Sequence, residues 1–125
     1  MTITCKAAIL RQTGAPAPYA ESRPISVEEI TLDPPGPMEA LVKIAGGGLC
    51  HSDLSVINGT RAKALPIALG HEGAGEVVEV GSAITDIKAG DPVVFQFSGS
   101  CGRCRRCQEG RPQNCEVSKR AGAKG

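Results

Sequence analysis

The sequence predicts a mainly β domain with short helices, on the strength of three observations. Glycine and proline, 16 and 9 of the 125 residues, are spread without a period, which is typical of many turns between short strands. Several short segments alternate apolar and polar residues between such turns. The apolar content of 41% is enough for the core of one domain, and the apolar runs are too short to span a membrane.

The first half of the chain carries three strand signals. Residues 6–11 (KAAILR) and 25–32 (ISVEEITL) alternate in polarity and are each followed by glycine and proline, so we predict two strands that end in turns. Residues 39–45 (EALVKIA) predict a third strand. This strand continues into three glycines at positions 46–48, where the backbone can bend sharply or be approached closely by another segment.

The second half continues with one helix and two strands. Residues 51–57 predict a short helix, and residues 73–80 (GAGEVVEV) predict a half-buried strand. A turn at residues 88–91 leads into a last predicted strand at 92–97 (PVVFQF). Residues 118–125 are polar and carry no strand signal.

Four of the six cysteines follow a C-x2-C-x2-C-x7-C pattern and lie close together in sequence: Cys101, Cys104, Cys107 and Cys115. Disulfides are disfavoured because the first residues do not resemble a secretion signal, which indicates an intracellular protein. An iron–sulfur cluster is disfavoured because the last spacing is long and no proline follows the fourth cysteine. The pattern favours one tetrahedral zinc ion, with the other two chemistries kept as alternatives.

Four arginines lie between these cysteines, and their charge would partly offset that of four thiolates on one divalent ion: Arg103, Arg105, Arg106 and Arg111. The alternative is a solvated basic loop or a nucleic-acid surface. A nucleic-acid partner is disfavoured because the chain has a net charge of +1 and only three aromatic residues. A site closed by four cysteines has no open position, so it should stabilise structure and not catalyse.

Cys50 and His71 form a second candidate metal site, although each is a weak signal alone. A single cysteine is more often a small buried apolar residue, and a single histidine is more often structural. Their context adds a family resemblance, because Gly70, His71 and Glu72 begin the pattern G-H-E-x2-G-x5-G. That pattern resembles the zinc signature of zinc-dependent medium-chain alcohol dehydrogenases.

Further segments resemble the N-terminal, GroES-like catalytic domain of the same family, in the same order: CKAAIL, ISVEEI, GLCHSDLSVINGT, AGDPVVFQF and the four-cysteine lobe. The resemblance implies a partly open β-barrel with a structural zinc lobe at about residues 98–117. It implies that residues 1–125 are the N-terminal portion of the catalytic domain of a larger α/β enzyme. The nucleotide-binding domain is expected to be absent from this chain, because Gly73-Ala-Gly75 continues as a strand and does not complete a phosphate-binding turn.

The resemblance implies that Cys50 and His71 are two of three protein ligands of a catalytic zinc, the third lying beyond residue 125. It implies that the four-cysteine lobe holds a structural zinc. Asp53 would orient the ligand histidine, or alternatively cap the short helix. Glu72 would lie close to the catalytic metal, or alternatively be a buried acid paired with a basic group.

The same resemblance implies that Ser52 accepts the substrate's proton and that His51 contacts the cofactor pyrophosphate, unless His51 is only a surface residue of the helix. Phe97 would line the substrate pocket, or alternatively pack in the core. The chain departs from several relatives at Ser55, where they carry a histidine that passes the proton outward. The outer proton relay would then need water, His51 or a cofactor ribose in its place.

The implied function is that of a zinc-dependent oxidoreductase. It would interconvert alcohols and aldehydes or ketones with zinc and NAD or NADP, in a cytoplasmic enzyme that forms homo-oligomers. Residues 1–125 alone should hold only the structural zinc, lack catalysis and leave some core and sheet edge without partners. The main alternative is a stand-alone zinc-stabilised β module that binds a partner without catalysis, and a zinc-free quinone reductase ranks below it.

Overall fold

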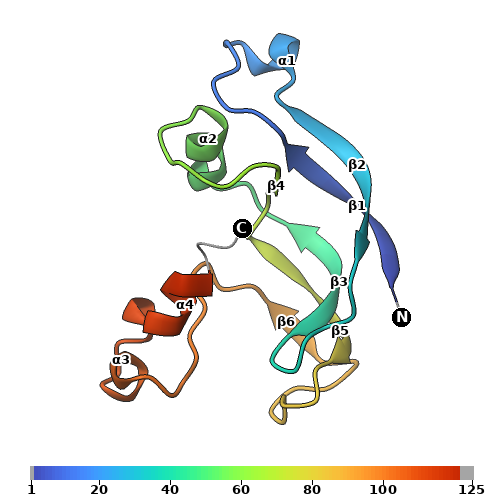
Figure 1. The fold of residues 1–125 in the computed structure, drawn as a ribbon. Helices are drawn as coiled ribbons and strands as arrows, with labels where there is room; N and C mark the ends of the chain where they lie inside the picture. Colours follow the sequence, from blue (N-terminus) through green and yellow to red (C-terminus); the bar gives the residue numbers. More distant parts are fainter. Residues whose placement is uncertain (1, 122–125) are drawn as a thin grey trace.

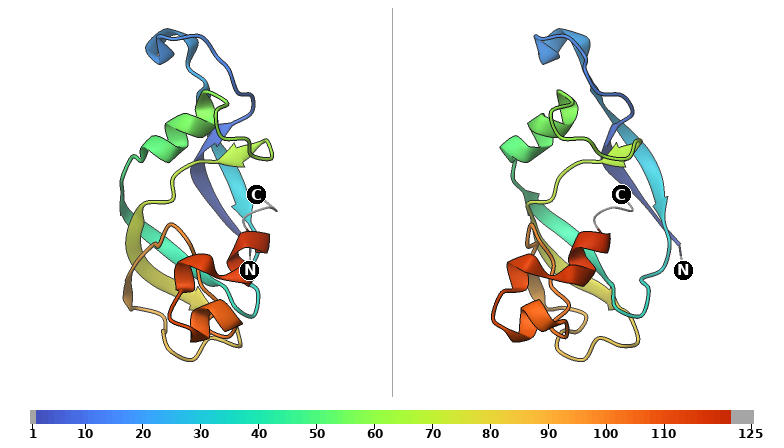
Figure 2. Two further views of the ribbon diagram at one scale, coloured as in Figure 1. Left: turned by 90° about the vertical axis from the view of Figure 1, so that its left-hand side faces the viewer. Right: turned by 60° about the vertical axis from the view of Figure 1, so that its left-hand side comes forward.

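The computed structural model describes residues 2–121, which form two three-stranded antiparallel sheets and several short helices (Figure 1). The strand orders are β2–β1–β4 and β3–β5–β6. In the two side views the sheets curve around the same side of the molecule without closing into a cylinder (Figure 2). The prediction of a mainly β, partly open architecture with short helices is confirmed.

The first sheet is built on one long hairpin. Strands β1 (Ile3–Leu10) and β2 (Ile25–Leu32) pair without a register shift, from Ile3 opposite Leu32 to Leu10 opposite Ile25. Both strands were predicted, and β2 has the predicted limits. Strand β4 (Ile67–Ala68) adds to the end of β1 and was missed, because two residues are too few for an alternating pattern.

The second sheet contains β3 (Ala40–Gly47), β5 (Gly73–Val80) and β6 (Pro92–Val94). Strands β3 and β5 were predicted, and β5 has the predicted limits. Strand β6 is shorter than the predicted 92–97, because it pairs with the first residues of β5, which begins at Gly73. The Phe95 amide still donates to the Gly73 carbonyl at 2.7 Å, and beyond that point β5 offers no partner.

Helix α2 (His51–Ile57) is the predicted helix, with the predicted limits. The other helical segments were missed because each is only one or two turns long: α1 (Tyr19–Ser22), α3 (Arg105–Gln108), the 3-10 turn η1 (Pro112–Asn114) and α4 (Glu116–Ala121). Of the polar end of the chain, residues 118–121 are helical and residues 122–125 lie outside the described part. No described helix has the length and apolar character needed to cross a bilayer.

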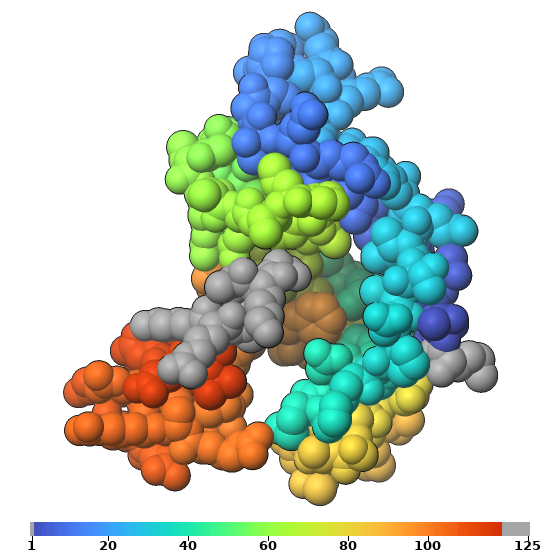
Figure 3. Space-filling view, viewed as in Figure 1, coloured from blue at the N-terminus to red at the C-terminus, as the bar shows by residue number. Residues whose placement is uncertain are grey.

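The core fixes helix α2 against the first sheet. Leu10, Val56 and Ile57 form a buried cluster, and four partly buried apolar residues pack around it: Tyr19, Ile25, Ile67 and Leu69. Elsewhere large apolar side chains face solvent, with Ile44 51% and Val94 79% exposed. This agrees with the expectation that part of the core lacks partners. Figure 3 shows the molecule hollowed between the cysteine lobe and the turn that connects β2 to β3.

Candidate functional site

The four cysteines of the C-terminal lobe converge on one point. The four sulfur atoms lie within 4.8 Å of one another, with Cys104 Sγ 3.5 Å from Cys107 Sγ and 3.9 Å from Cys115 Sγ. With Zn–S bonds of about 2.3 Å, two sulfurs of a tetrahedral site should be about 3.8 Å apart. An iron–sulfur cluster places several atoms between its thiolates and needs wider separations. All six cysteines are free thiols, so the donor set and its spacing fit a single tetrahedral ion.

Helix α3 and turn η1 produce this convergence. Cys104 precedes α3, Cys107 lies within it, and Cys115 follows η1. The two short helical segments therefore position three of the four ligands. Cys115 is the one fully enclosed member of the cluster, with 1% of its surface exposed. The sequence signal for the cluster was therefore local, because one short segment carries all four side chains.

Backbone amides stabilise the thiolate form of two of these cysteines. The pKa of Cys115 is lowered to about 6, chiefly because the Ser118 N–H donates to its sulfur at 3.4 Å. The pKa of Cys104 is also lowered, chiefly by the backbone amide of Cys107. Burial and then the neighbouring Cys104 thiol raise the pKa of Cys107 to about 11. A cation at the centre would favour the thiolate form of this last cysteine and so offset the cost of its burial.

Two of the four arginines of the lobe pair with a neighbouring carboxylate. Arg105 Nε and Arg106 Nη1 pair with the Glu109 carboxylate at 2.7 and 3.3 Å. Among residues 2–121 the recorded hydrogen bonds to sulfur from outside the cluster come from backbone amides, such as those of Arg103 and Ser118. The expectation that the arginines partly offset the charge of a four-thiolate site stays a prediction.

The second cluster joins three ligand-type side chains from segments that are distant in sequence. Ligand atoms of Cys50, His71 and Glu72 lie within 4.8 Å of one another. Cys50 is the N-cap residue of α2, and the other two residues directly precede β5. Glu72 is exposed, and the recorded ion pairs of the described residues do not include it, so the alternative of a buried, paired acid is not realised.

Two glycines allow this approach. A Cβ atom at Gly48 would lie 2.2 Å from Glu72 Oε2, so the carboxylate can occupy its position only because residue 48 has no side chain. The Gly48 amide also donates to the Glu72 carbonyl at 2.8 Å. Gly70 has a φ of 108°, a conformation that favours glycine, and it turns the chain immediately before His71. The close approach expected at glycines 46–48 is confirmed at Gly48, which directly follows β3.

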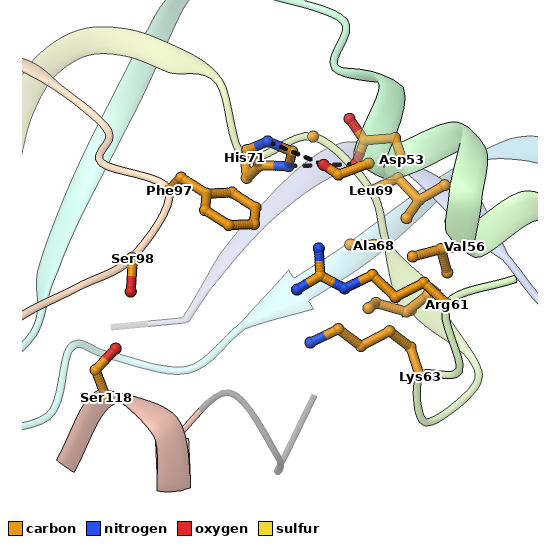
Figure 4. Close-up of a pocket in the computed structure, with 13 residues that line it drawn as sticks. Asp53, Val56, Arg61, Lys63, Ala68, Leu69, His71, Phe97, Ser98 and Ser118 are labelled. Carbon is orange, nitrogen blue, oxygen red and sulfur yellow. Dashed lines mark hydrogen bonds and ion pairs between the residues drawn. The ribbon is translucent and has the colours of Figure 1, made fainter. Parts of the chain in front are cut away.

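Asp53 and Ser52 contact the two ring nitrogens of His71. The Asp53 Oδ1 atom lies 3.4 Å from Nδ1 (Figure 4). The Ser52 Oγ atom lies 3.4 Å from Nε2. A carboxylate beside Nδ1 favours the tautomer with its proton on Nδ1, which leaves the Nε2 lone pair for a metal or a donor. Because Cys50 and not Asp53 occupies the N-cap position of α2, the capping alternative for Asp53 is wrong.

His51 and Ser55 form a separate pair one turn apart on α2. His51 is exposed, and its Nδ1 atom lies 3.4 Å from Ser55 Oγ. The Ser55 hydroxyl also lies 3.2 Å from the His51 carbonyl, to which it can donate. Ser55, which stands where the family resemblance implies a relay histidine in several relatives, thus contacts His51 on the same helix.

Two neighbouring cavities share the wall formed by Ser52, His71 and Phe97. The smaller, of about 320 Å³, also includes Cys50 and Glu72 and is therefore the space in front of the three-residue cluster. The Phe97 ring meets the His71 ring edge-on, with centroids 4.8 Å apart. Since Phe97 is 60% exposed, it is not a core residue in the described chain.

Sequence reasoning missed other residues that line these cavities. Phe95 lines the smaller cavity, and the alternation of PVVFQF could have identified it, because residues two apart share one face of an extended segment. Arg61 and Lys63 line the larger cavity of about 510 Å³, together with Ser98 and Ser118. No local pattern marks these four, because they come from three separate loops and helices.

Comparison with known proteins identifies the family to which the domain is similar. The family model described as the alcohol dehydrogenase GroES-like domain matches residues 36–125. The NDMA-dependent alcohol dehydrogenase of Amycolatopsis methanolica is 42% identical over 112 residues, and the geraniol dehydrogenase of Castellaniella defragrans is 43% identical over 113. Each alignment covers 90% of this chain and 28% of the relative.

A solved structure shares the fold as well. An alcohol dehydrogenase zinc-binding domain protein from Burkholderia ambifaria superposes with a TM-score of 0.81 at 38% identity, covering 93% of this chain and 29% of that protein. The chain therefore spans less than a third of the length of these relatives. By the family match, the sequence identity and the shared fold together, the chain belongs to the alcohol dehydrogenase GroES-like domain family.

Proposed function

We propose that the chain is the N-terminal portion of the catalytic domain of a zinc-dependent oxidoreductase. The complete enzyme would interconvert alcohols and aldehydes or ketones with NAD or NADP. The observation that carries the proposal is the convergence of Cys50, His71 and Glu72 in front of a cavity. A module that only binds a partner has no use for such an accessible donor set, and no observation favours that alternative.

Two zinc sites follow from the donor sets. Cys101, Cys104, Cys107 and Cys115 would enclose a structural ion, while Cys50 and His71 would hold a catalytic ion with Glu72 nearby. Zinc at the second site would supply Lewis acidity, which favours loss of the proton from a substrate hydroxyl. A third protein ligand and the nucleotide-binding domain would come from the remainder of the complete enzyme.

The side chains around His71 would perform the positioning and proton transfer. Asp53, whose Oδ1 lies 3.4 Å from His71 Nδ1, would accept a hydrogen bond from Nδ1–H and so orient the imidazole, which would leave Nε2 available to the metal. Ser52 lies on the Nε2 side and would receive the substrate's proton as it releases its own. The nicotinamide would accept the hydride from the substrate carbon.

The exposed pair on α2 is the proposed exit for that proton. His51 Nδ1 and Ser55 Oγ are close enough for a weak hydrogen bond, and an imidazole can exchange a proton with solvent near neutral pH. His51 would also contact the pyrophosphate of the cofactor, and Phe97 would line the substrate pocket. We further propose a cytoplasmic, homo-oligomeric enzyme, in which residues 1–125 without the rest retain only the structural zinc.

The test is the Cys50→Ser variant of the complete protein, with Cys5→Ser as its matched control, since Cys5 lies on β1 outside both clusters. Wild type should reduce NAD or NADP in the presence of primary or secondary alcohols and carry about two zinc ions per chain. The Cys50→Ser variant should lose one ion and nearly all activity, whereas the control keeps both. Full activity of Cys50→Ser, or no alcohol-dependent reduction by wild type, would contradict the proposal.

A further inference from the structure

The larger cavity beside the metal-facing one has a cationic wall. It encloses about 510 Å³ and shares Ser52, His71 and Phe97 with the smaller cavity, so a molecule that reaches the three-residue cluster can extend into it. Figure 4 shows Arg61 and Lys63 side by side, directed into the space between Phe97 and Ser118. Both come from the loop between α2 and β4.

Arg61 is held in place yet not neutralised. Its guanidinium carbon lies 5.4 Å from the centroid of the Phe97 ring, a cation–π distance that limits where the side chain can point. No ion pair recorded among residues 2–121 involves Arg61. The acid that lines this cavity, Asp53, lies 3.4 Å from His71 Nδ1 and is engaged there.

The rest of the lining suits a partly apolar chain that ends in an anion. Val56, Ile67 and Leu69 supply an apolar surface, while Ser98 and Ser118 present hydroxyls on the wall opposite Arg61 (Figure 4). A carboxylate can accept two parallel hydrogen bonds from a guanidinium and further bonds from hydroxyls.

We propose that this site takes alcohols and aldehydes that carry an anionic group, a carboxylate, at the end remote from the reacting carbon. Arg61 is the residue that selects them. The inference rests on the proposed function, because it assigns the substrate class of the same site. The reacting end lies in the smaller cavity, the aliphatic part crosses the shared wall at Phe97, and the carboxylate meets Arg61.

The test compares ω-hydroxy carboxylic acids of increasing length with the unsubstituted primary alcohols of matched length, using the complete protein. Wild type should show the higher kcat/KM for the acids, and the preference should peak at one chain length. In Arg61→Gln the ratio of kcat/KM for acid over neutral alcohol should fall about 10- to 100-fold, the loss of a charge-assisted hydrogen bond. Arg61→Lys should retain part of the ratio because it keeps the charge.

Arg23→Gln is the control, since it removes an exposed arginine that does not line this cavity, and it should leave the ratio unchanged. An equal fall for acids and neutral alcohols in Arg61→Gln would overturn the substrate class while leaving alcohol oxidation intact. A rise in KM for the dinucleotide alone would overturn it too, because the anion would then belong to the cofactor.

A binding measurement separates this inference from the proposed function. Hexanoate should shift the NMR signal of the Arg61 Nε–H group and bind more weakly to Arg61→Gln, whether or not the protein oxidises alcohols. Hexanoate that binds equally well to both proteins, or to neither, would overturn the assignment of Arg61. Absence of alcohol oxidation with Arg61-dependent hexanoate binding would refute the proposed function and support the anion site.

Discussion

The cysteine lobe provides the sharpest prediction, which concerns Cys115→Ser. Cys115 is the only residue of the segment 98–118 that is fully buried, so the lobe has almost no apolar core of its own. Burying one side chain contributes about 1.5–3 kcal/mol, whereas a structural zinc contributes about 10–16 kcal/mol of binding free energy in small zinc domains. The bound metal should therefore contribute several times more free energy to the stability of the lobe than the burial of its side chains does.

The substitution removes one of four ligands and leaves the other three thiols packed together. Serine is not ionised at neutral pH, whereas the pKa of the Cys115 thiol is lowered to about 6, so the variant loses the ligand whose thiolate form the lobe favours. We expect Cys115→Ser to lose about one zinc ion per chain. We also expect α3 and η1 to unfold locally, because their short lengths do not form stable helices alone.

Zinc content measured by atomic spectroscopy tests the first expectation, and amide hydrogen exchange tests the second. The Cys101 amide donates to Cys115 Sγ at 3.3 Å, so its exchange should accelerate strongly in the variant. Amides in the β1–β2 hairpin, such as that of Lys6, should exchange as in wild type. Wild-type zinc content in Cys115→Ser, or unchanged protection of the lobe after chelation, would refute the reasoning.

Three further predictions concern single side chains. In the complete enzyme Ser52→Ala should reduce turnover about 10²- to 10⁴-fold, the usual range for lost proton transfer, whereas Ser55→Ala should have a much smaller effect; equal losses would contradict their separate roles. Asp53→Asn should weaken zinc binding at the second site about 10- to 100-fold, which a chelator competition measures, and unchanged affinity would show that its contact is incidental. Hydrogen bonds from Arg11 hold the pKa of Glu28 at about 2, below its ordinary 4.5. Because the folded pKa is the lower one, the pair stabilises above pH 4.5, so the melting-temperature difference between wild type and Glu28→Gln should shrink as pH falls towards 2 and a constant difference would exclude this coupling.

Local signals predicted the limits of several strands and of one helix. The strands 25–32 and 73–80 and the helix 51–57 have the predicted limits, because alternation and flanking glycine or proline are properties of neighbouring residues. The four-cysteine cluster was predictable for the same reason. Strand β4 was missed because its two residues extend only where β1 lies beside them.

The sequence by itself determined which side chains can bind a metal and which short segments form strands or helices. Only the tertiary structure decided that the start of α2 meets the turn before β5, which joins Cys50 to His71, and that Arg61 stacks on Phe97 in the neighbouring cavity. These contacts depend on the buried cluster of Leu10, Val56 and Ile57, which docks α2 on the first sheet. Such long-range packing leaves no periodic trace in the chain, because residues far apart in sequence meet only when apolar surface is buried between them.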